Sequence, residues 1–226
     1  MPNTEQHFES NAETLNKVFE RAHSTPFTIP RFQRGYSWSK EEGNFDDFWE
    51  DLKSSDMRFF GTMLFNISPN SDGTIDIVDG QQRLTTCTIL VSVIRNMINN
   101  YVKELPKNDS FKGPLKKYAS EIEEKYIKRK RTNTETGEEE HVYYINQRKL
   151  QIRKFFKKYI QDYNHQHEIL DLTLKKDTEE GKMRQCYKEL KECIESDEDF
   201  ISANENGGQG LLRYFGLFFT SQKRAD

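Results

Sequence analysis

The stretch TIDIVDGQQRLTT, residues 74–86, decides how this chain folds. Its first five residues mix apolar and polar side chains in near alternation, which predicts a strand from Thr74 to Val78. From Gln81 to about Glu104, apolar side chains recur every three or four residues, which predicts one long helix. Gly80 lies between these two elements and permits a tight turn that other residues resist. The stretch therefore predicts a strand that turns directly into a helix.

The start of this predicted helix has the features of an anion site. Its first backbone N–H groups lack partners within the helix and carry the positive end of the helix dipole, which suits phosphate. Arg83 adds a planar guanidinium, Gln81 and Gln82 add amide donors, and Thr85 extends the polar first turns. The Asp79 carboxylate could hold Mg²⁺ or orient a water molecule. A simpler alternative is that Asp79 only caps the helix and Arg83 pairs with an acid, but two adjacent glutamines have no use as caps.

A second group of candidate residues lies upstream, in IPRFQRGYSW at residues 29–38. Arginines interleaved with aromatic rings suit phosphate contacts and base stacking. The alternative is that Phe32, Tyr36 and Trp38 fill the core while the arginines form ion pairs. We regard Gln33 and Arg34 as the stronger functional candidates.

The remaining apolar patterns predict an α+β fold, with a small mixed sheet followed by a mainly helical extension. Strands are expected at residues 59–67, 74–78 and 141–145, with the first two forming a hairpin, and at 27–30 as an edge strand or strand end, because Pro30 cannot donate to a ladder. Helices are expected at residues 12–22, from a Ser39 and Glu42 capping box to Leu52, and at 81–104, 115–131, 147–163 and 183–197. Residues 206–210 read as a flexible loop and 211–220 as an apolar terminal segment. We divide the chain into domains at 1–104 and 105–226.

Composition narrows the functional classes only a little. The 226 residues are 34% hydrophobic and 31% charged, with a net charge of −3. Residues 103–158 carry 16 Lys and Arg against 9 Asp and Glu, between two acidic flanks. This basic middle could be a DNA-binding face, or simply the solvated surface of amphipathic helices.

Several other classes of protein lack support in the sequence. There is no Walker-type phosphate loop, no zinc-protease motif and no hydrolase nucleophile elbow. The three cysteines form no closely spaced pair, so neither a disulfide framework nor a zinc ribbon is indicated, and Cys87 is expected in the core. No apolar run approaches the length of a membrane span and no signal pattern is present, so we expect a cytoplasmic protein. Residues 211–220 lie so near the end that we expect the chain to continue in a longer product.

The two motifs taken together, with FGTM at residues 60–63 between them, resemble the N-terminal domain of GmrSD-type restriction systems. The order and spacing match over about residues 12–104. The resemblance implies a ParB/sulfiredoxin-like fold. It also implies that residues 79–83 form a nucleotide-phosphate site, with Gln33 and Arg34 beside it.

In this family, nucleotide binding and hydrolysis at the DGQQR segment license the cleavage of modified foreign DNA in antiphage defence. The resemblance therefore implies a nucleoside triphosphate as ligand, and Asp79 could hold Mg²⁺ beside it as a cofactor. Asp79, Gln81, Gln82 and Arg83 would be catalytic, and Gly80, Tyr36 and Thr85 would join the binding site. The expected partners are DNA and an HNH-type nuclease domain or subunit, since no such motif occurs in this sequence. Assembly of this chain into an oligomer is compatible with this interpretation.

Three hypotheses follow for the function of the chain. The first is a regulatory module that binds and hydrolyses nucleoside triphosphates. The second is a non-catalytic DNA-sensing module that uses the same pocket for the phosphate backbone, with residues 103–158 as its DNA face. The third is an inactive fragment of a longer HNH nuclease.

Overall fold

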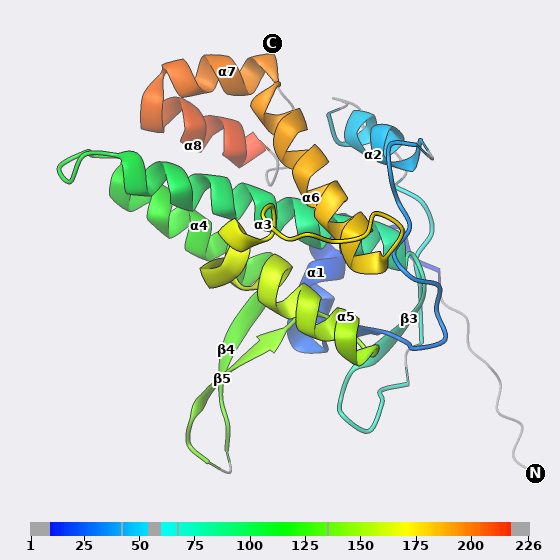
Figure 1. Cartoon of the computed structure of the whole chain (residues 1–226). Coiled ribbons are helices and arrows are strands. Elements are labelled where there is room, and N and C mark those ends of the chain that lie inside the picture. The colour runs from blue at the N-terminus through cyan, green and yellow to red at the C-terminus, as the bar shows by residue number, and fades with distance from the viewer. Residues whose placement is uncertain (1–9, 42, 54–59, 67, 135, 218–226) are drawn as a thin grey trace, which may run out of the picture.

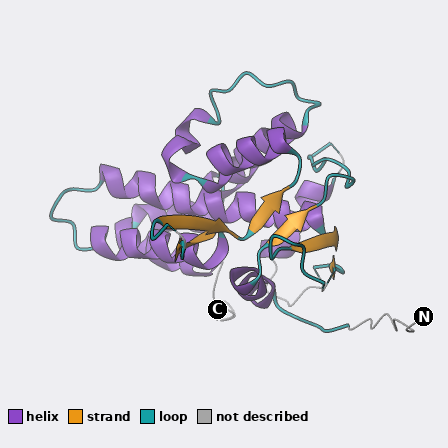
Figure 2. Cartoon of the chain, turned by 90° about the horizontal axis from the view of Figure 1, so that it is seen from below, coloured by secondary structure: helices purple, strands orange, loops and turns teal. Residues whose placement is uncertain are grey.

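The computed structural model describes residues 10–41, 43–53, 60–66, 68–134 and 136–217. Its helices are α1 (Leu15–Ser24), α2 (Asn44–Lys53), α3 (Gln81–Glu104), α4 (Lys112–Tyr126), α5 (Leu150–Phe155), α6 (Glu179–Glu195), α7 (Glu198–Glu205) and α8 (Gly207–Leu217). Its strands are β1 (Phe27–Ile29), β2 (Leu64–Phe65), β3 (Ile75–Asp79), β4 (Lys128–Thr132), β5 (Glu139–Tyr143) and β6 (Ile145–Gln147). The predicted α+β class is confirmed, and the helices form most of the molecule (Figure 1, Figure 2).

The main sheet is small and mixed, with strand order β2-β3-β1-β6. Strand β1 pairs in parallel with both β3 and β6, so of the two alternatives for residues 27–30 the edge strand is wrong and the strand end is confirmed. Pro30 follows the last residue of β1, where its missing N–H interrupts no ladder. The predicted hairpin is confirmed as the antiparallel pair β2–β3, although β2 is short and Phe59 lies outside the described residues.

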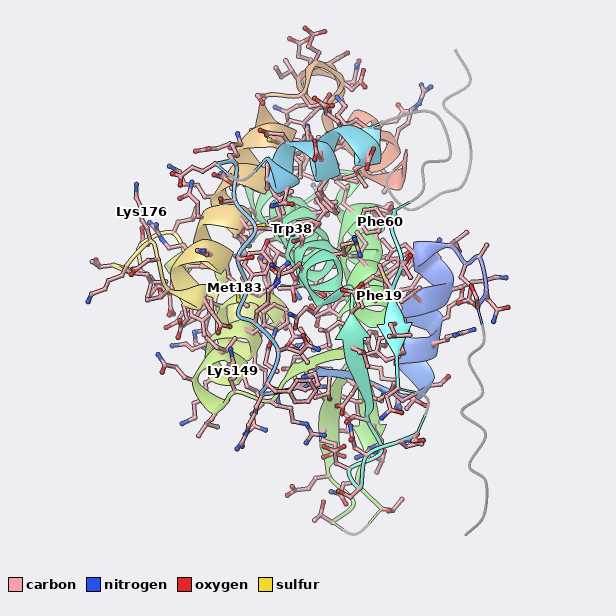
Figure 3. The ribbon with its side chains drawn as sticks, turned by 90° about the vertical axis from the view of Figure 1, so that its right-hand side faces the viewer. Phe19, Trp38, Phe60, Lys149, Lys176 and Met183 are labelled. Carbon is pink, nitrogen blue, oxygen red and sulfur yellow. The ribbon has the colours of Figure 1, made fainter. Side chains whose placement is uncertain are left out.

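Helix α3 runs through the middle of the molecule and begins and ends at the predicted residues. The sequence predicted one buried stripe, but every residue from Leu84 to Asn96 is buried. Thr86 and Thr88 satisfy their hydroxyls by donating to the carbonyls four residues earlier, of Gln82 and Leu84. Phe19 of α1 and Met183 of α6 lie on opposite sides of α3 in Figure 3, which shows how neighbours surround it. Tertiary packing therefore buries the polar side of this helix as well.

An arginine is fully buried at the centre of this packing. Arg95 Nη1 lies 2.9 Å from Glu123 Oε2 on α4 and donates to the carbonyl of Gln161, also at 2.9 Å. Arg95 Nη2 donates to the carbonyl of Ile160 at 3.3 Å. Both carbonyls lie at the end of the π-helical turn Phe156–Gln161, where a helix leaves acceptors without intrahelical donors. Arg95 thus joins α3, α4 and the π-helical turn.

Two segments differ from their predicted structure. Residues 115–131 were expected as one helix, but the helix ends at Tyr126 and β4 pairs with β5 as a separate antiparallel ribbon (Figure 1). Lys and Arg favour helices intrinsically, but the antiparallel ladder between β4 and β5 overrides that preference here. Residues 206–210 were expected as a loop but fall largely in α8, where a side chain at Gly208 would collide with Phe111. That glycine serves close packing.

The other predicted helices shift at their ends. Residues 12–22 correspond to α1, whose N-cap is Thr14. Of the predicted helix at 147–163, Gln147 ends β6, and α5, the π-helical turn and the start of a 3-10 turn at 163–168 follow from Leu150. Residues 183–197 correspond to α6, which begins earlier. Helix α2 begins later than expected, and the predicted capping residue Glu42 lies outside the described residues. The last three residues of the predicted apolar segment, 218–220, also lie outside them. The domain division at residue 104 stays a prediction, but the sheet and the core span it. Among the described helices, none is both long and apolar enough to cross a bilayer.

The cysteines differ in how readily they should react. Cys87 is buried, as predicted, and so is Cys186. Burial raises the pKa of the Cys87 thiol far above its usual value and that of Cys186 to about 12, whereas Cys193 is only half-buried. Because the thiolate is the reactive form, a thiol reagent at pH 8 should modify at most Cys193 in the native protein and all three cysteines after unfolding. Rapid native modification of two thiols would contradict this packing.

Candidate functional site

The predicted turn between β3 and α3 is present. Gly80 is the N-cap residue, in the left-handed conformation with φ 89°, and no side chain caps the helix. A Cβ atom there would lie 2.7 Å from Cγ of Met63, so both the backbone and the space require glycine. Asp79 therefore does not cap α3, and the alternative that assigned it only this role is wrong. The first N–H groups of the helix have no side-chain acceptor at the cap position.

The adjacent glutamines join the helix start to residues 30–38. Gln82 Oε1 accepts a hydrogen bond from the Ser37 N–H at 2.9 Å, and Gln82 Nε2 donates to the Gly35 carbonyl at 3.0 Å. Gln81 Nε2 donates to the Arg34 carbonyl at 3.1 Å. Both glutamine side chains are buried. These bonds explain why two glutamines stand together, and they bring the two sequence motifs into contact.

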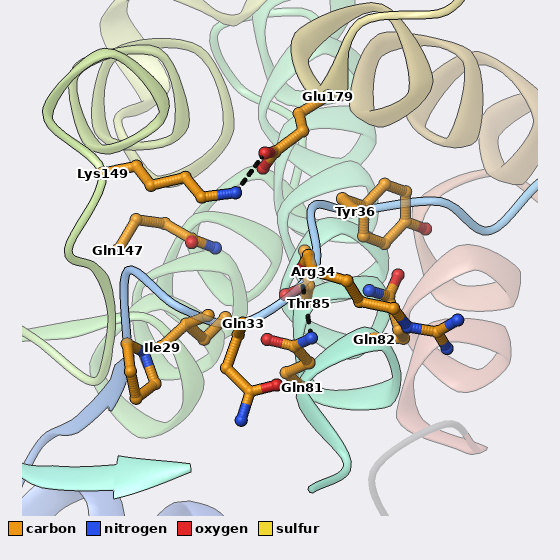
Figure 4. A pocket seen from close by; sticks show the side chains of 11 residues that line it. Ile29, Gln33, Arg34, Tyr36, Gln81, Gln82, Thr85, Gln147, Lys149 and Glu179 are labelled. Carbon is orange, nitrogen blue, oxygen red and sulfur yellow. Dashed lines mark hydrogen bonds and ion pairs between the residues drawn. The ribbon is translucent and has the colours of Figure 1, made fainter. Parts of the chain in front are cut away.

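A narrow pocket lies between the two motifs (Figure 4). It is lined by Ile29, Pro30, Gln33, Arg34, Tyr36, Gln81, Gln82, Thr85, Gln147, Lys149 and Glu179. Six of these were predicted as site residues: Gln33, Arg34, Tyr36, Gln81, Gln82 and Thr85. Its cavity volume is about 10 Å³, which is room for about one water molecule. Any larger ligand therefore requires a lining side chain to move.

One buried atom in this pocket lacks a hydrogen-bond partner within the described structure. Gln81 is 7% exposed, and its Oε1 atom accepts no hydrogen bond there. Its Nε2 atom is committed to the Arg34 carbonyl, which fixes the orientation of the amide. A buried acceptor without a donor costs about 1–3 kcal/mol. Gln81 Oε1 can therefore accept a hydrogen bond from a donor that enters the pocket, such as a water molecule.

Tyr36, Gln33 and the neighbouring aromatics mostly serve structure. The Tyr36 hydroxyl is 2.8 Å from Thr86 Oγ1, and burial raises the pKa of Tyr36 well above its usual value, so the phenol stays neutral. Gln33 Nε2 donates to the Val78 carbonyl at 2.9 Å. The Trp38 ring packs edge-on against Phe48, as the core alternative predicted. Phe32, by contrast, is 81% exposed.

Three predicted residues do not line the pocket. Gly80 forms the turn beside it. Arg83 Nη1 donates to the Thr62 carbonyl at 2.8 Å, and its guanidinium lies against Gly61. Asp79 is exposed and pairs with Leu64 of β2. The Arg83 side chain therefore reaches residues 61–62 and not the pocket, and Asp79 lies at the end of β3 beside β2.

Three lining residues were missed by sequence reasoning. Gln147 ends β6, Lys149 directly precedes α5, and Glu179 lies in the first turn of α6. They belong to no motif, and they reach the pocket because β6 pairs with β1 and α6 packs along α3. No local signal in the sequence could have identified them.

The described residues provide no preformed multidentate metal site. No group of three or more His, Cys, Asp or Glu side chains that could hold a metal ion occurs among them. Mg²⁺, however, commonly takes one or two carboxylates together with substrate phosphates and waters. The exposed Asp79 carboxylate fits that kind of shared coordination, in which phosphates supply the remaining ligands.

Some cations of the basic stretch 103–158 are engaged in contacts within the protein where the structure describes it. On the β4–β5 ribbon, Lys130 pairs with Glu139 at 2.9 Å, and Arg131 pairs with Glu140. Arg129 donates to the carbonyl of His23 at 2.9 Å. These pairs fit the alternative of a solvated surface, and DNA binding by this stretch stays a prediction.

Comparisons with known proteins identify one matching family. The model of the GmrSD restriction endonuclease N-terminal domain matches residues 15–215. The match extends well beyond residue 104 and includes α6, so it covers every residue that lines the pocket. A search of curated proteins found no match.

Proposed function

We propose a function that starts from the family of this chain, because the chain belongs to the GmrSD restriction endonuclease N-terminal domains and is a component of a restriction system. In that system it would be the nucleotide-responsive module. In this proposal the chain binds nucleoside triphosphates and hydrolyses them. A nuclease domain or subunit of the HNH type would then cut the DNA. Cleavage of modified foreign DNA would depend on the nucleotide state of this module.

One observation carries the proposal. Two motifs that stand 47 residues apart at Arg34 and Gln81 meet in one pocket. That pocket combines an exposed arginine, an uncapped helix start and a buried acceptor, Gln81 Oε1, that lacks a donor. Cations and free N–H groups attract phosphate, and an acceptor next to a space for about one water suits the orientation of a nucleophilic water.

The residues divide into roles on this basis. Arg34 would contact the phosphates, with Thr85 and Gln33 completing the wall of the pocket. Gln81 would orient the attacking water through Oε1, while Gln82 holds the loop that carries Arg34. Asp79 would share Mg²⁺ with the phosphates on the β2 side of the helix start, and the ion would neutralise phosphate charge there. Arg83 would reach the same phosphates after leaving the Thr62 carbonyl.

Phosphate release from GTP, CTP, UTP and ATP tests this proposal, measured with Mg²⁺ present. Gln81→Ala and Arg34→Ala should each reduce turnover about tenfold or more, since each removes a group aimed at the reacting phosphates. Arg131→Gln, which changes one charge on the distant β4–β5 ribbon, should leave turnover unchanged. Asp79→Ala and Arg83→Ala test separately whether the residues beside β2 contribute to turnover. Wild-type activity in both variants would mean that only the pocket residues carry out the reaction.

Direct binding measurements decide between the alternatives. If equilibrium dialysis finds no binding of any of the four nucleotides, the proposal is wrong. Salt-dependent DNA binding by the same preparation would then support the DNA-sensing alternative, in which the pocket takes a phosphodiester backbone.

A further inference from the structure

We propose that Lys149 is a phosphate ligand of this pocket and that Glu179 is the internal carboxylate that holds Lys149 until a nucleotide arrives. The inference rests on the proposed nucleotide binding, and it adds two charged residues from outside the sequence motifs to the site. Both residues lie beyond residue 104, outside the segment that carries the sequence motifs. Their ion pair joins α6 to the start of α5 at one side of the pocket.

The geometry places this ion pair directly in the pocket. Lys149 Nζ lies 2.6 Å from Glu179 Oε1, and their side chains are 35% and 23% exposed. Figure 4 shows the pair on one side of the pocket, with Gln81 and Gln82 on the other. Among the lining residues, Arg34 and Lys149 are the cations and Glu179 is the anion. Releasing Glu179 would therefore leave two cations facing the start of α3.

The size of the pocket, like its charge, indicates that Glu179 must move before a phosphate can bind. The pocket now has room for about one water molecule, and a phosphate group is larger. The Glu179 carboxylate packs directly over Gly35, so that a Cβ atom at residue 35 would collide with it. Glu179 has a flexible side chain in the first turn of α6, and it can swing toward solvent at little cost. It is the lining group whose departure both enlarges the pocket and removes a like charge from the path of a polyphosphate.

The unsatisfied acceptor is an independent sign that a ligand belongs here. Gln81 Oε1 is buried and lacks a donor among the described residues, although Lys149 lines the same pocket. Lys149 is held instead by Glu179. A bound nucleoside triphosphate would bring phosphate oxygens as partners for Lys149, and its ribose hydroxyls or ordered waters would bring a donor for Gln81.

The two members of the pair should therefore have opposite effects on binding. Glu179→Gln removes the competing charge and should lower the dissociation constant for GTP and for inorganic triphosphate about three- to tenfold, as measured by calorimetry. Lys149→Gln removes a phosphate ligand and should raise it about tenfold or more, with partial rescue by Lys149→Arg. Gly35→Ala, which displaces the Glu179 carboxylate sterically, should act like Glu179→Gln.

Helix α6 offers matched controls for these variants. Lys191 and Glu195 form an ion pair at 2.7 Å on the same helix, and neither lines the pocket. Glu195→Gln and Lys191→Gln should leave the dissociation constant unchanged. Thermal unfolding without nucleotide verifies that each variant is folded.

The signs of the changes separate the possible outcomes. If Glu179→Gln and Lys149→Gln both weaken binding by similar factors, the pair is only a structural link and the inference is wrong. It is also wrong if neither variant changes the affinity while the wild-type protein binds nucleotide. A wild-type protein that binds no nucleotide instead contradicts the proposed function itself.

Discussion

Replacing Arg95 with methionine should lower the free energy of unfolding by about 3 kcal/mol, one of the largest effects expected from a single substitution in this chain. For a domain of this size, that corresponds to a fall in melting temperature of about 6–12 °C. Urea denaturation and thermal unfolding both measure the loss. The fully buried guanidinium contacts a carboxylate and two backbone carbonyls from distant segments, and methionine satisfies none of them.

The magnitude follows from the partners that would remain. The carbonyls of Ile160 and Gln161 would lose a charged donor at the end of the π-helical turn. Glu123 would lose less, because it is 28% exposed and keeps Lys128 at 3.2 Å. The expected loss therefore lies at the lower end of the usual range for breaking a buried ion pair.

An exposed arginine supplies the control. Arg131 on β4 is 57% exposed and pairs with Glu140. Arg131→Met should change stability by no more than about 1 kcal/mol, because water replaces such an exposed pair. Equal losses from both variants would mean that Arg95 does not carry the packing described above.

Replacing Gln82 with methionine should reduce nucleotide binding about tenfold or more and lower the free energy of unfolding by about 2–3 kcal/mol. Methionine keeps the length of the side chain but removes both hydrogen bonds, to the Ser37 N–H and the Gly35 carbonyl. The loop at residues 35–37 would then lose two of its hydrogen bonds to α3. Of the described hydrogen bonds to this helix, those from Gln81 to the Arg34 carbonyl and between Tyr36 and Thr86 would still hold the segment that carries Arg34. Calorimetric titration with GTP and urea denaturation measure the two effects.

Gln185→Met on α6 is the matched control for this substitution. Gln185 donates to Glu189 Oε1 at 2.9 Å within the same helix, so its loss releases no other segment. We expect nearly unchanged nucleotide binding, with a loss of stability of its own because the buried Glu189 carboxylate loses this donor. If Gln82→Met binds nucleotide as tightly as the wild type, the two hydrogen bonds of Gln82 are not needed to position the site.

Sequence reasoning succeeded best where local rules decide the structure. The bounds of α3 and the turn at Gly80 were predicted correctly, because a strand pattern, a glycine and a helical period follow one another without interruption. It failed at β4, because Lys and Arg give a helical propensity that pairing with β5 overrides. It also failed at residues 206–210, where glycines that suggest a loop instead permit close helix packing.

The sequence by itself determined that DGQQR follows a strand at the start of a long helix, and it identified residues 29–38 as the second motif. Only the tertiary structure decided which of these side chains share a pocket. Gln81 and Thr85 stand one turn apart on the same face of α3, whereas Arg83 projects about 200° around the helix from Gln81 and reaches the Thr62 carbonyl. Lys149 and Glu179 complete the pocket because β6 pairs with β1 and α6 packs on α3. Such contacts join residues far apart in the chain, and no local pattern encodes them.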